Sequence, residues 1–338
     1  MISNGGRVFN NWGHIGYDTN SFNNQALVTG AGSIWSNATV VLVGDSGSSN
    51  SLAIRDGGLV DDYWGIVGEG ESGSNNSVYV ESGGVWRSQQ LAVGDMGSHN
   101  ALFVDGGSVF VSTSMVVGYN PLYCNNLVQL ESGQVIVTNA AGNATLEVYG
   151  GSFVLLGGTL RVDTLVVTND CAQFMHLGGT LVYKTLMLDP NLSAVGDGIL
   201  NGWKQHYGLD PFDPNLANED PDGDGFTSLQ KFLAGFNPTN AAAYPHIISV
   251  ARQGANINVT YRGANGDNTW SPGTASLTNV LEFTTGTVNG GYSNNFVSAN
   301  VTNILSGGTG TGIVTNMIDS GAATNSSSRY YRVRVLVP

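Results

Sequence analysis

The residues whose types and spacing are best suited to chemistry form an acidic loop in the second half of the chain. Its pattern is Asp220-x-Asp222-x-Asp224-Gly225-Phe226-x-Ser228. Calcium prefers hard oxygen ligands, and the loops that bind it supply them from alternate positions, with a glycine at the sharp turn. The sequence therefore predicts a calcium site formed by the carboxylates of Asp220, Asp222 and Asp224, the carbonyl of Phe226 and the side chain of Ser228.

The loop departs from the usual calcium pattern at its twelfth position, where a bidentate glutamate normally completes the ligand set. Lys231 stands at that position, so the expected affinity for calcium is reduced. A related segment upstream, residues 193–198, keeps only Asp197 of the three aspartate positions, and we expect no ion there. The alternative for the acidic loop is a solvated turn without metal, although clustered carboxylates repel one another when no cation is present.

Residues 208–240, GLDPFDPNLANEDPDGDGFTSLQKFLAGFNPTN, resemble thrombospondin type 3 and dockerin-like calcium repeats. Such repeats are found ahead of C-terminal β domains in large secreted bacterial proteins. The resemblance implies calcium as a cofactor, with Asp210 and Asp213 as additional carboxylate ligands.

A catalytic site is not expected elsewhere in the chain. Enzymes that act on acidic polysaccharides need carboxylates and cations that converge on one face, but the cations of residues 1–189 fall in different repeats. They are Arg7, Arg55, Arg87, Arg161 and Lys184. The pair Asp61-Asp62 has no counterpart in the other repeats and no evident cationic partner. We therefore predict no enzymatic activity, with a polysaccharide lyase or hydrolase as the enzyme-class alternative.

The first half of the chain is an array of repeats of about 25 residues. Each unit has an asparagine, apolar residues two and four positions later, and a glycine at the seventh. The asparagines are Asn50, Asn76, Asn100 and Asn126, and the glycines are Gly57, Gly83, Gly107 and Gly133. Alternation within each unit predicts short strands with one buried face, so each unit suits one coil of a parallel β-helix. We expect glycine and asparagine to take left-handed corners and the asparagine amides to bond between coils.

Three segments of this array, VTGAGSIW (28–35), VGDSGSSNSLAIRDGG (43–58) and VGDMGSHNALFVDGG (93–107), resemble the repeats of autotransporter-type passenger domains. Those domains belong to large secreted β-helix proteins of Gram-negative bacteria. The resemblance implies an extracellular or cell-surface location. It leaves the function open among adhesin, surface spacer and enzyme.

The whole chain is predicted to be mainly β, in three parts. Residues 1–189 form a parallel β-helix, residues 190–245 a calcium-binding linker with short helices at 199–207 and 228–234, and residues 246–338 an antiparallel β-sandwich. Glycine is frequent, with 48 residues, and 41% of the chain is hydrophobic, which is enough to bury a large core. The formal net charge of -13 repels nucleic acid and anionic lipid, so we expect neither nucleic-acid binding nor membrane insertion.

Cysteines and aromatic residues leave alternatives open. Cys124 and Cys171 lie in different coils, and the sequence is equally consistent with a disulfide after export and with two unpaired buried thiols. Aromatic residues recur near the glycine corners, at Trp35, Trp64, Trp86 and Phe110. Packing in or between coils is the favoured interpretation, and an exposed stripe that binds sugars is the alternative.

The last coil of a solenoid exposes unpaired backbone groups, and this chain enters a repeat almost directly after its first residues, which lack signal-peptide character. We therefore expect an extracellular structural protein that binds itself head to tail, as a filament or surface-layer subunit, with the C-terminal domain of one copy meeting the open β-helix end of the next. The alternative is a cell-surface adhesin or carbohydrate-binding stalk whose partners are surface glycans.

Overall fold

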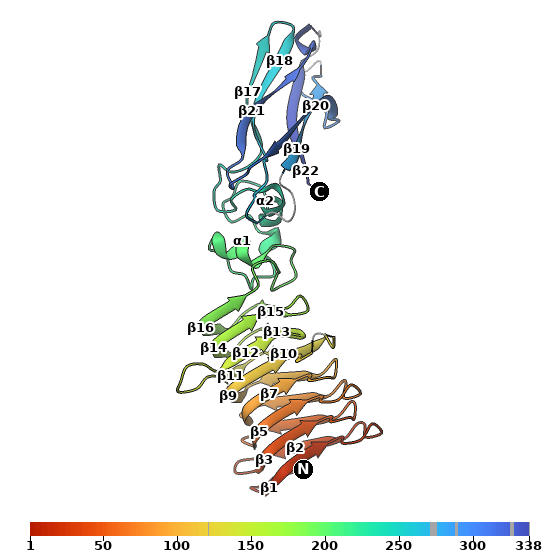
Figure 1. Ribbon diagram of the computed structural model, residues 1–338, viewed down its shortest axis with the longest axis vertical. Helices are drawn as coiled ribbons and strands as arrows, with labels where there is room; N and C mark the ends of the chain where they lie inside the picture. Colours follow the sequence, from red (N-terminus) through yellow and green to blue (C-terminus); the bar gives the residue numbers. More distant parts are fainter. Residues whose placement is uncertain (121, 271–275, 288–289, 325–327, 338) are drawn as a thin grey trace. The chain divides into compact units, whose positions relative to one another are not determined.

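The computed structural model describes residues 1–120, 122–270, 276–287, 290–324 and 328–337. It shows a mainly β protein with a parallel β-solenoid of about seven turns followed by antiparallel sheets (Figure 1). The chain divides into two compact units. Unit 1 comprises Met1–Gly196 and Asp210–Pro214, and unit 2 comprises Asp197–Leu209 and Asn215–Pro338. The parallel β-helix predicted from the repeats is confirmed.

Two parallel sheets build the solenoid of unit 1. The first contains β1 (Arg7–Ile15), β3 (Ile34–Val43), β5 (Leu59–Val67), β7 (Val85–Val93), β9 (Gly107–Val117), β11 (Gly133–Val137), β12 (Thr145–Val148), β14 (Thr159–Val167) and β16 (Thr180–Leu188). The second contains β2 (Gln25–Thr29), β4 (Ser51–Arg55), β6 (Ser77–Glu81), β8 (Ala101–Asp105), β10 (Asn126–Leu130), β13 (Gly151–Leu155) and β15 (Gln173–His176). Each strand pairs with the equivalent strand of the next coil, so equivalent residues form columns along the solenoid.

The apolar positions of the repeat form these columns inside the solenoid. One column runs through β2, β4, β6, β8, β10 and β13, and every member is fully buried. Its residues are Val28, Ile54, Val80, Val104, Leu130 and Leu155. Branched side chains suit this position because they pack well on a pleated surface.

The repeated asparagines form a buried ladder, as the sequence predicted. The backbone N–H of Asn50 donates to Oδ1 of Asn76 at 2.8 Å, and the N–H of Asn76 donates to Oδ1 of Asn100 at 2.9 Å. The same contact joins Asn100 to Asn126 at 3.0 Å. All four asparagines are at most 1% exposed, so each amide satisfies a backbone group that would otherwise be buried without a partner.

The glycine of the apolar-Gly pair explains how the ladder fits. A Cβ atom on Gly44 would lie 2.0 Å from Nδ2 of Asn76, and one on Gly68 would lie 2.1 Å from Nδ2 of Asn100. Both glycines also have positive φ angles, +74° and +79°. Glycine is required here because the backbone of one coil passes directly over the asparagine of the next.

The left-handed corners differ in position from the prediction. The residue before each ladder asparagine takes the positive φ angle, as in Ser49, Asn75, His99 and Asn125, whereas the ladder asparagine itself does not. At the second corner, Gly57, Gly83 and Gly133 have positive φ, but in the coil of Gly107 the positive angle belongs to Gly106. The ladder asparagine is held differently, because its N–H donates to the side chain of the next asparagine and its carbonyl accepts from the first strand residue of the next coil, as Asn50 does from Ser77.

A second period, of two coils, is superimposed on the first. Trp35 of β3 reaches back over Gly13 of β1, and Trp86 of β7 reaches back over Gly65 of β5, so that a Cβ on either glycine would lie 2.5 or 2.6 Å from the indole. Trp86 is fully buried and Trp35 is 9% exposed. The favoured interpretation of these two tryptophans as packing residues is therefore confirmed, and Trp86 is not available to a sugar.

The two ends of the solenoid core differ. At the C-terminal end, the N–H of Phe174 donates to the carbonyl of Ala194 and the N–H of His176 donates to the carbonyl of Phe212. The ring of Phe212 packs on Phe174 with 4.5 Å between centroids. At the N-terminal end, the contact with β2 that the described residues show is a short bridge between Ile2 and Val28. Unit 1 thus includes part of the segment that the sequence assigned to the linker.

Unit 2 begins with three short helices, α1 (Asn201–His206), η1 (Leu216–Asn218) and α2 (Ser228–Ala234). Thr227 and Gln230 form a capping box at the start of α2, and Gly235 closes it in the left-handed conformation. The remainder contains β17 (His246–Gln253), β18 (Asn256–Gly263), β19 (Ser276–Thr285), β20 (Val297–Ser306), β21 (Ile313–Asp319), η2 (Ala322–Thr324) and β22 (Arg329–Leu336). They form two three-stranded antiparallel sheets that share a core.

Candidate functional site

The acidic loop brings three of the predicted calcium ligands together. Carboxylate oxygens of Asp220, Asp222 and Asp224 lie within 4.8 Å of one another. The Asp220 carboxylate accepts hydrogen bonds from the backbone N–H groups of Gly223, Asp224 and Gly225. These bonds, above all the one from Gly225, lower the pKa of Asp220. Asp220 therefore organises the turn itself.

Lys231 places its ammonium group among these carboxylates. Its Nζ lies 2.5 Å from Oδ2 of Asp222 and 2.7 Å from Oδ2 of Asp224. The Lys231 side chain is 1% exposed, and the two aspartates are 6% and 2% exposed. The residue at the twelfth loop position thus brings a positive charge to the place where a calcium-binding loop holds its ion.

The other predicted ligands fall into two sets. Asp210 and Asp213 belong to unit 1, whereas Phe226 and Ser228 belong to unit 2 with the three aspartates. The Ser228 hydroxyl donates to the carbonyl of Glu219, and the Phe226 N–H donates to Oδ1 of Asp224. This donor set does not fit a calcium ion, because Lys231 already binds two of its three carboxylates. Calcium binding stays a prediction of the sequence.

A second copy of this arrangement lies upstream, where the sequence predicted no ion. Nζ of Lys204 lies 2.8 Å from Oδ2 of Asp197, and the two side chains are 0% and 4% exposed. Oδ1 of Asp197 accepts from the N–H of Ile199, just as Oδ1 of Asp224 accepts from the N–H of Phe226. In both copies the aspartate precedes a glycine and the lysine follows seven residues later, on a short helix. Sequence reasoning missed Lys204, although this repeated Asp-Gly and lysine spacing was present to find it.

A polar cleft of about 500 Å³ lies on the first sheet of the solenoid. Its floor is a column of outward residues from β3, β5, β7, β9 and β11, each in register with the next. They are Ser36, Asp61, Arg87, Phe110 and Ile136. Asp61 and Arg87 are therefore neighbours on adjacent coils. The sequence predicted no cationic partner for Asp61-Asp62; the structure places Arg87 in register with Asp61, because residues 26 positions apart become neighbours when the chain coils.

Asp62 lies behind this floor and is 8% exposed. Its Oδ2 accepts from Nε1 of Trp86 at 2.7 Å, and its Oδ1 accepts from Oγ of Ser88 at 2.5 Å. Asn10 accepts from Nε1 of Trp35 in the same way, at 3.1 Å. Burial raises the pKa of Asp62 from its ordinary value of 3.8 to about 7, and the hydrogen bonds from Ser88 and Trp86 oppose the shift.

We expect Asp62→Asn to remove a pH dependence from stability. Because the folded-state pKa of Asp62 is raised, its stabilising contribution is fully present below about pH 4 and is lost as the pH rises through about 7. In the variant, the difference in unfolding free energy between pH 4 and pH 8 should be smaller by on the order of 4 kcal/mol. An asparagine can still accept from Trp86, as Asn10 does from Trp35. Urea titrations of both proteins across this range test it, with Asp61→Asn as the exposed control. An identical pH profile for Asp62→Asn and the wild type would contradict the expectation.

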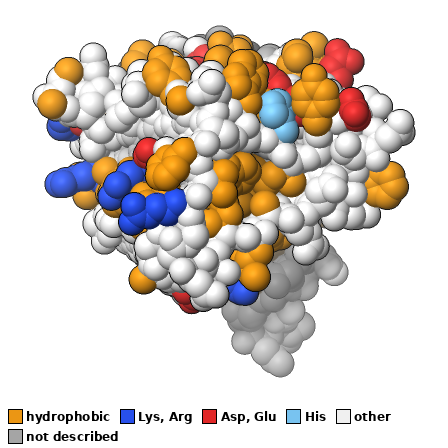
Figure 2. Space-filling view, turned by 90° about the horizontal axis from the view of Figure 1, so that it is seen from below, with side chains coloured by type: hydrophobic (Ala, Val, Ile, Leu, Met, Phe, Trp, Pro, Cys, Tyr) orange, Lys and Arg blue, Asp and Glu red, His pale blue; other side chains and the backbone are white. Residues whose placement is uncertain are grey.

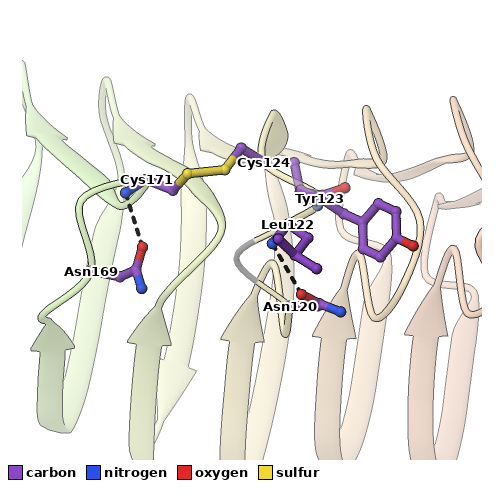
Figure 3. The surroundings of a disulfide bond; sticks show 7 residues. Asn120, Leu122, Tyr123, Cys124, Asn169 and Cys171 are labelled. Carbon is purple, nitrogen blue, oxygen red and sulfur yellow. Dashed lines mark hydrogen bonds between the residues drawn. A yellow bond between two sulfur atoms is a disulfide. The ribbon is translucent and has the colours of Figure 1, made fainter.

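A disulfide joins Cys124 and Cys171, with Cα atoms 6.1 Å apart (Figure 3). The loops that carry them precede β10 and β15, which lie on either side of β13 in the second sheet. The bond therefore spans two coil steps of the solenoid. Of the two alternatives that the sequence left open, the structure shows the disulfide.

No helix in the described part of the chain is long and apolar enough to cross a bilayer.

Comparisons with known proteins identify no relative of this chain. No family model matches the sequence, and neither a curated protein nor a solved structure is detectably similar to it.

Proposed function

We propose that this chain is an extracellular structural protein whose solenoid assembles head to tail through its first coil. The observation that carries the proposal is the apolar N-terminal end of the solenoid. Phe9 is 68% exposed and Trp12 is 60% exposed, and Val8, which stands in the column of the buried Trp35 and Trp86, is 41% exposed. Large apolar side chains gathered in this way mark an interaction surface.

Figure 2 shows hydrophobic side chains gathered on this end of the molecule. A hollow of about 400 Å³ lies there, between Met1, Trp12, Trp35 and neighbouring residues of β1 and β2. β1 is also the terminal strand of the first sheet, so one of its edges lies unpaired within the described residues. Such an edge is a template for another strand.

A second copy of the chain is the occupant that we infer. β1 and β16 are terminal strands at opposite ends of one parallel sheet, so the edge of β16 in one copy is complementary to the edge of β1 in the next. Met187 on β16 is 51% exposed and Tyr183 is 43% exposed, which offers apolar surface on that side. A contact between two different edges repeats without closing and gives a filament.

Location outside the cell is supported by the disulfide, because such bonds persist in oxidising compartments. The low share of charged residues, 11%, and the acidic balance remain consistent with a surface protein. The resemblance of the repeats to autotransporter passenger domains supports the same location.

The double variant Phe9→Ser/Trp12→Ser is expected to abolish assembly. Wild-type protein at high concentration should form filaments in negative-stain electron microscopy and large species in light scattering, whereas the variant should stay monomeric with an unchanged circular dichroism spectrum. Trp64→Ser is the matched control, because Trp64 stands in the column of Trp12, two coils further in, and is 45% exposed. A wild-type protein that stays monomeric at every concentration, or a double variant that assembles normally, would overturn the proposal.

We also propose that the acidic loop carries its own cation. Lys231 neutralises Asp222 and Asp224 at the place where the sequence predicts calcium, and Lys204 neutralises Asp197 in the same way. The linker helices would then be held by ion pairs within the chain, independently of external calcium.

A further inference from the structure

We propose that the polar cleft on the first sheet binds a neutral polysaccharide chain that lies along the solenoid axis. This inference goes beyond assembly and does not depend on it, since the cleft lies on the sheet face and the assembly surface at the first coil. The two are separated by experiment, because variants of the cleft leave Phe9 and Trp12 intact.

The first step is the length of the cleft. Its floor residues come from five successive strands, β3 to β11. With strands about 4.8 Å apart, four steps extend over roughly 19 Å. A site of this shape accommodates several units of an extended polymer rather than one small molecule.

The second step is what lies behind the floor. Asn37 is 2% exposed, and its column continues through Asp62, Ser88 and Val111, which are also buried. The amide atoms of Asn37 are enclosed and face Gly13 of the preceding coil, so a ligand in the cleft does not reach them. The side chains that a ligand contacts are therefore the more exposed ones of the floor and its rim.

The third step is the chemistry of the remaining lining. Asp61 and Arg87 are exposed on adjacent coils, Ser88 and Gln89 add neutral polar groups, and Tyr63 is 45% exposed beside them. Opposite charges side by side do not select an ion of either sign. Sugar hydroxyls both donate and accept, which matches this mixture, and an aromatic face suits the apolar face of a sugar ring.

A peptide fits the cleft less well. Extended peptides gain most of their affinity by adding a strand to an open sheet edge. The strands under the cleft are paired on both sides, so their backbone groups are already in the ladder. An acidic polysaccharide is disfavoured by Asp61 and by the net charge of -13.

Affinity gel electrophoresis tests the proposal with laminarin, mannan and xylan as neutral probes and polygalacturonate as the acidic probe. We expect the native protein to be retarded by at least one neutral probe. Tyr63→Ala and Arg87→Ala should each weaken that retardation about tenfold. Tyr79→Ala and Arg55→Ala are the matched controls, because both residues lie on the second sheet and remain outside the cleft.

Asn37→Val is the internal control, because Val111 and Val137 occupy the same buried column naturally. Removal of the unpartnered amide should raise the midpoint of urea unfolding and leave retardation by the neutral probe unchanged, since the amide is enclosed. Retardation by the acidic probe alone, by no probe, or equally in wild type and all cleft variants would overturn the proposal.

Discussion

Lys231→Met is expected to lower the unfolding free energy of unit 2 by about 3–5 kcal/mol, because the change leaves Asp222 and Asp224 buried together without a cation. Methionine keeps a similar length and removes only the charge. Differential scanning calorimetry should show the transition of unit 2 shifted to lower temperature. Arg55→Met is the control, since Arg55 makes exposed ion pairs and its loss should change stability by less than about 1 kcal/mol.

Lys231→Glu tests whether the ammonium group of Lys231 or a calcium ion neutralises the acidic loop. This variant restores the glutamate that calcium-binding loops carry at their twelfth position and places a fourth carboxylate beside Asp220, Asp222 and Asp224. In chelator it should be at least as unstable as Lys231→Met, and millimolar calcium should restore much of the loss. The wild type should melt at the same temperature in calcium and in chelator. A wild-type transition that rises by several degrees with calcium would refute Lys231 as the resident cation and support the calcium site.

The second large effect is expected at the contact between Gly65 and Trp86. Gly65→Val should destabilise unit 1 by about 3 kcal/mol or more, because the added side chain would overlap the Trp86 indole. Trp86→Val should cost about 3–5 kcal/mol through the cavity that it leaves. Valine occurs naturally at both positions in the neighbouring coils. Val41 is in register with Gly65, and Val60 is in register with Trp86.

The double variant Gly65→Val/Trp86→Val is therefore expected to be more stable than the sum of the single effects by at least about 1 kcal/mol. The valine at position 65 would fill part of the space that the indole vacates. Urea unfolding of the four proteins completes the cycle. Strict additivity of the two changes would show that Gly65 and Trp86 do not share one space.

Repeated local signals explain how much of the fold the sequence could predict. The asparagine, the apolar alternation and the glycines recur in every coil, so the parallel solenoid and the ladder of Asn50, Asn76, Asn100 and Asn126 followed from spacing. The helix at 228–234 followed from Gly235, which ends α2 in the left-handed conformation. The C-terminal sheets followed from alternation beginning at His246.

The cleft could not be predicted in the same way, because it depends on the register between coils. Asp61 and Arg87 become neighbours only when the exact length of each coil is known, and the coils differ in length, since Asp61 and Arg87 are 26 residues apart whereas Arg87 and Phe110 are 23 apart. The sequence shows that Lys231 departs from the calcium-loop pattern. Its ion pairs with Asp222 and Asp224 could not be predicted, because they depend on the orientation of α2. The two-coil period was visible in the paired segments at 8–13 and 60–65, which share valine, a polar residue, tryptophan and glycine at matching positions.

This two-coil period has a consequence for how such a chain lengthens. Trp35 needs the glycine of the coil before it, and so does Trp86, so one coil inserted between β5 and β7 would separate a tryptophan from the space that receives it. Gain or loss of a whole pair would preserve every contact. A segment of about 52 residues is therefore the unit whose gain or loss leaves each tryptophan with its glycine, and we expect length variants of this part of the solenoid to differ by even numbers of coils.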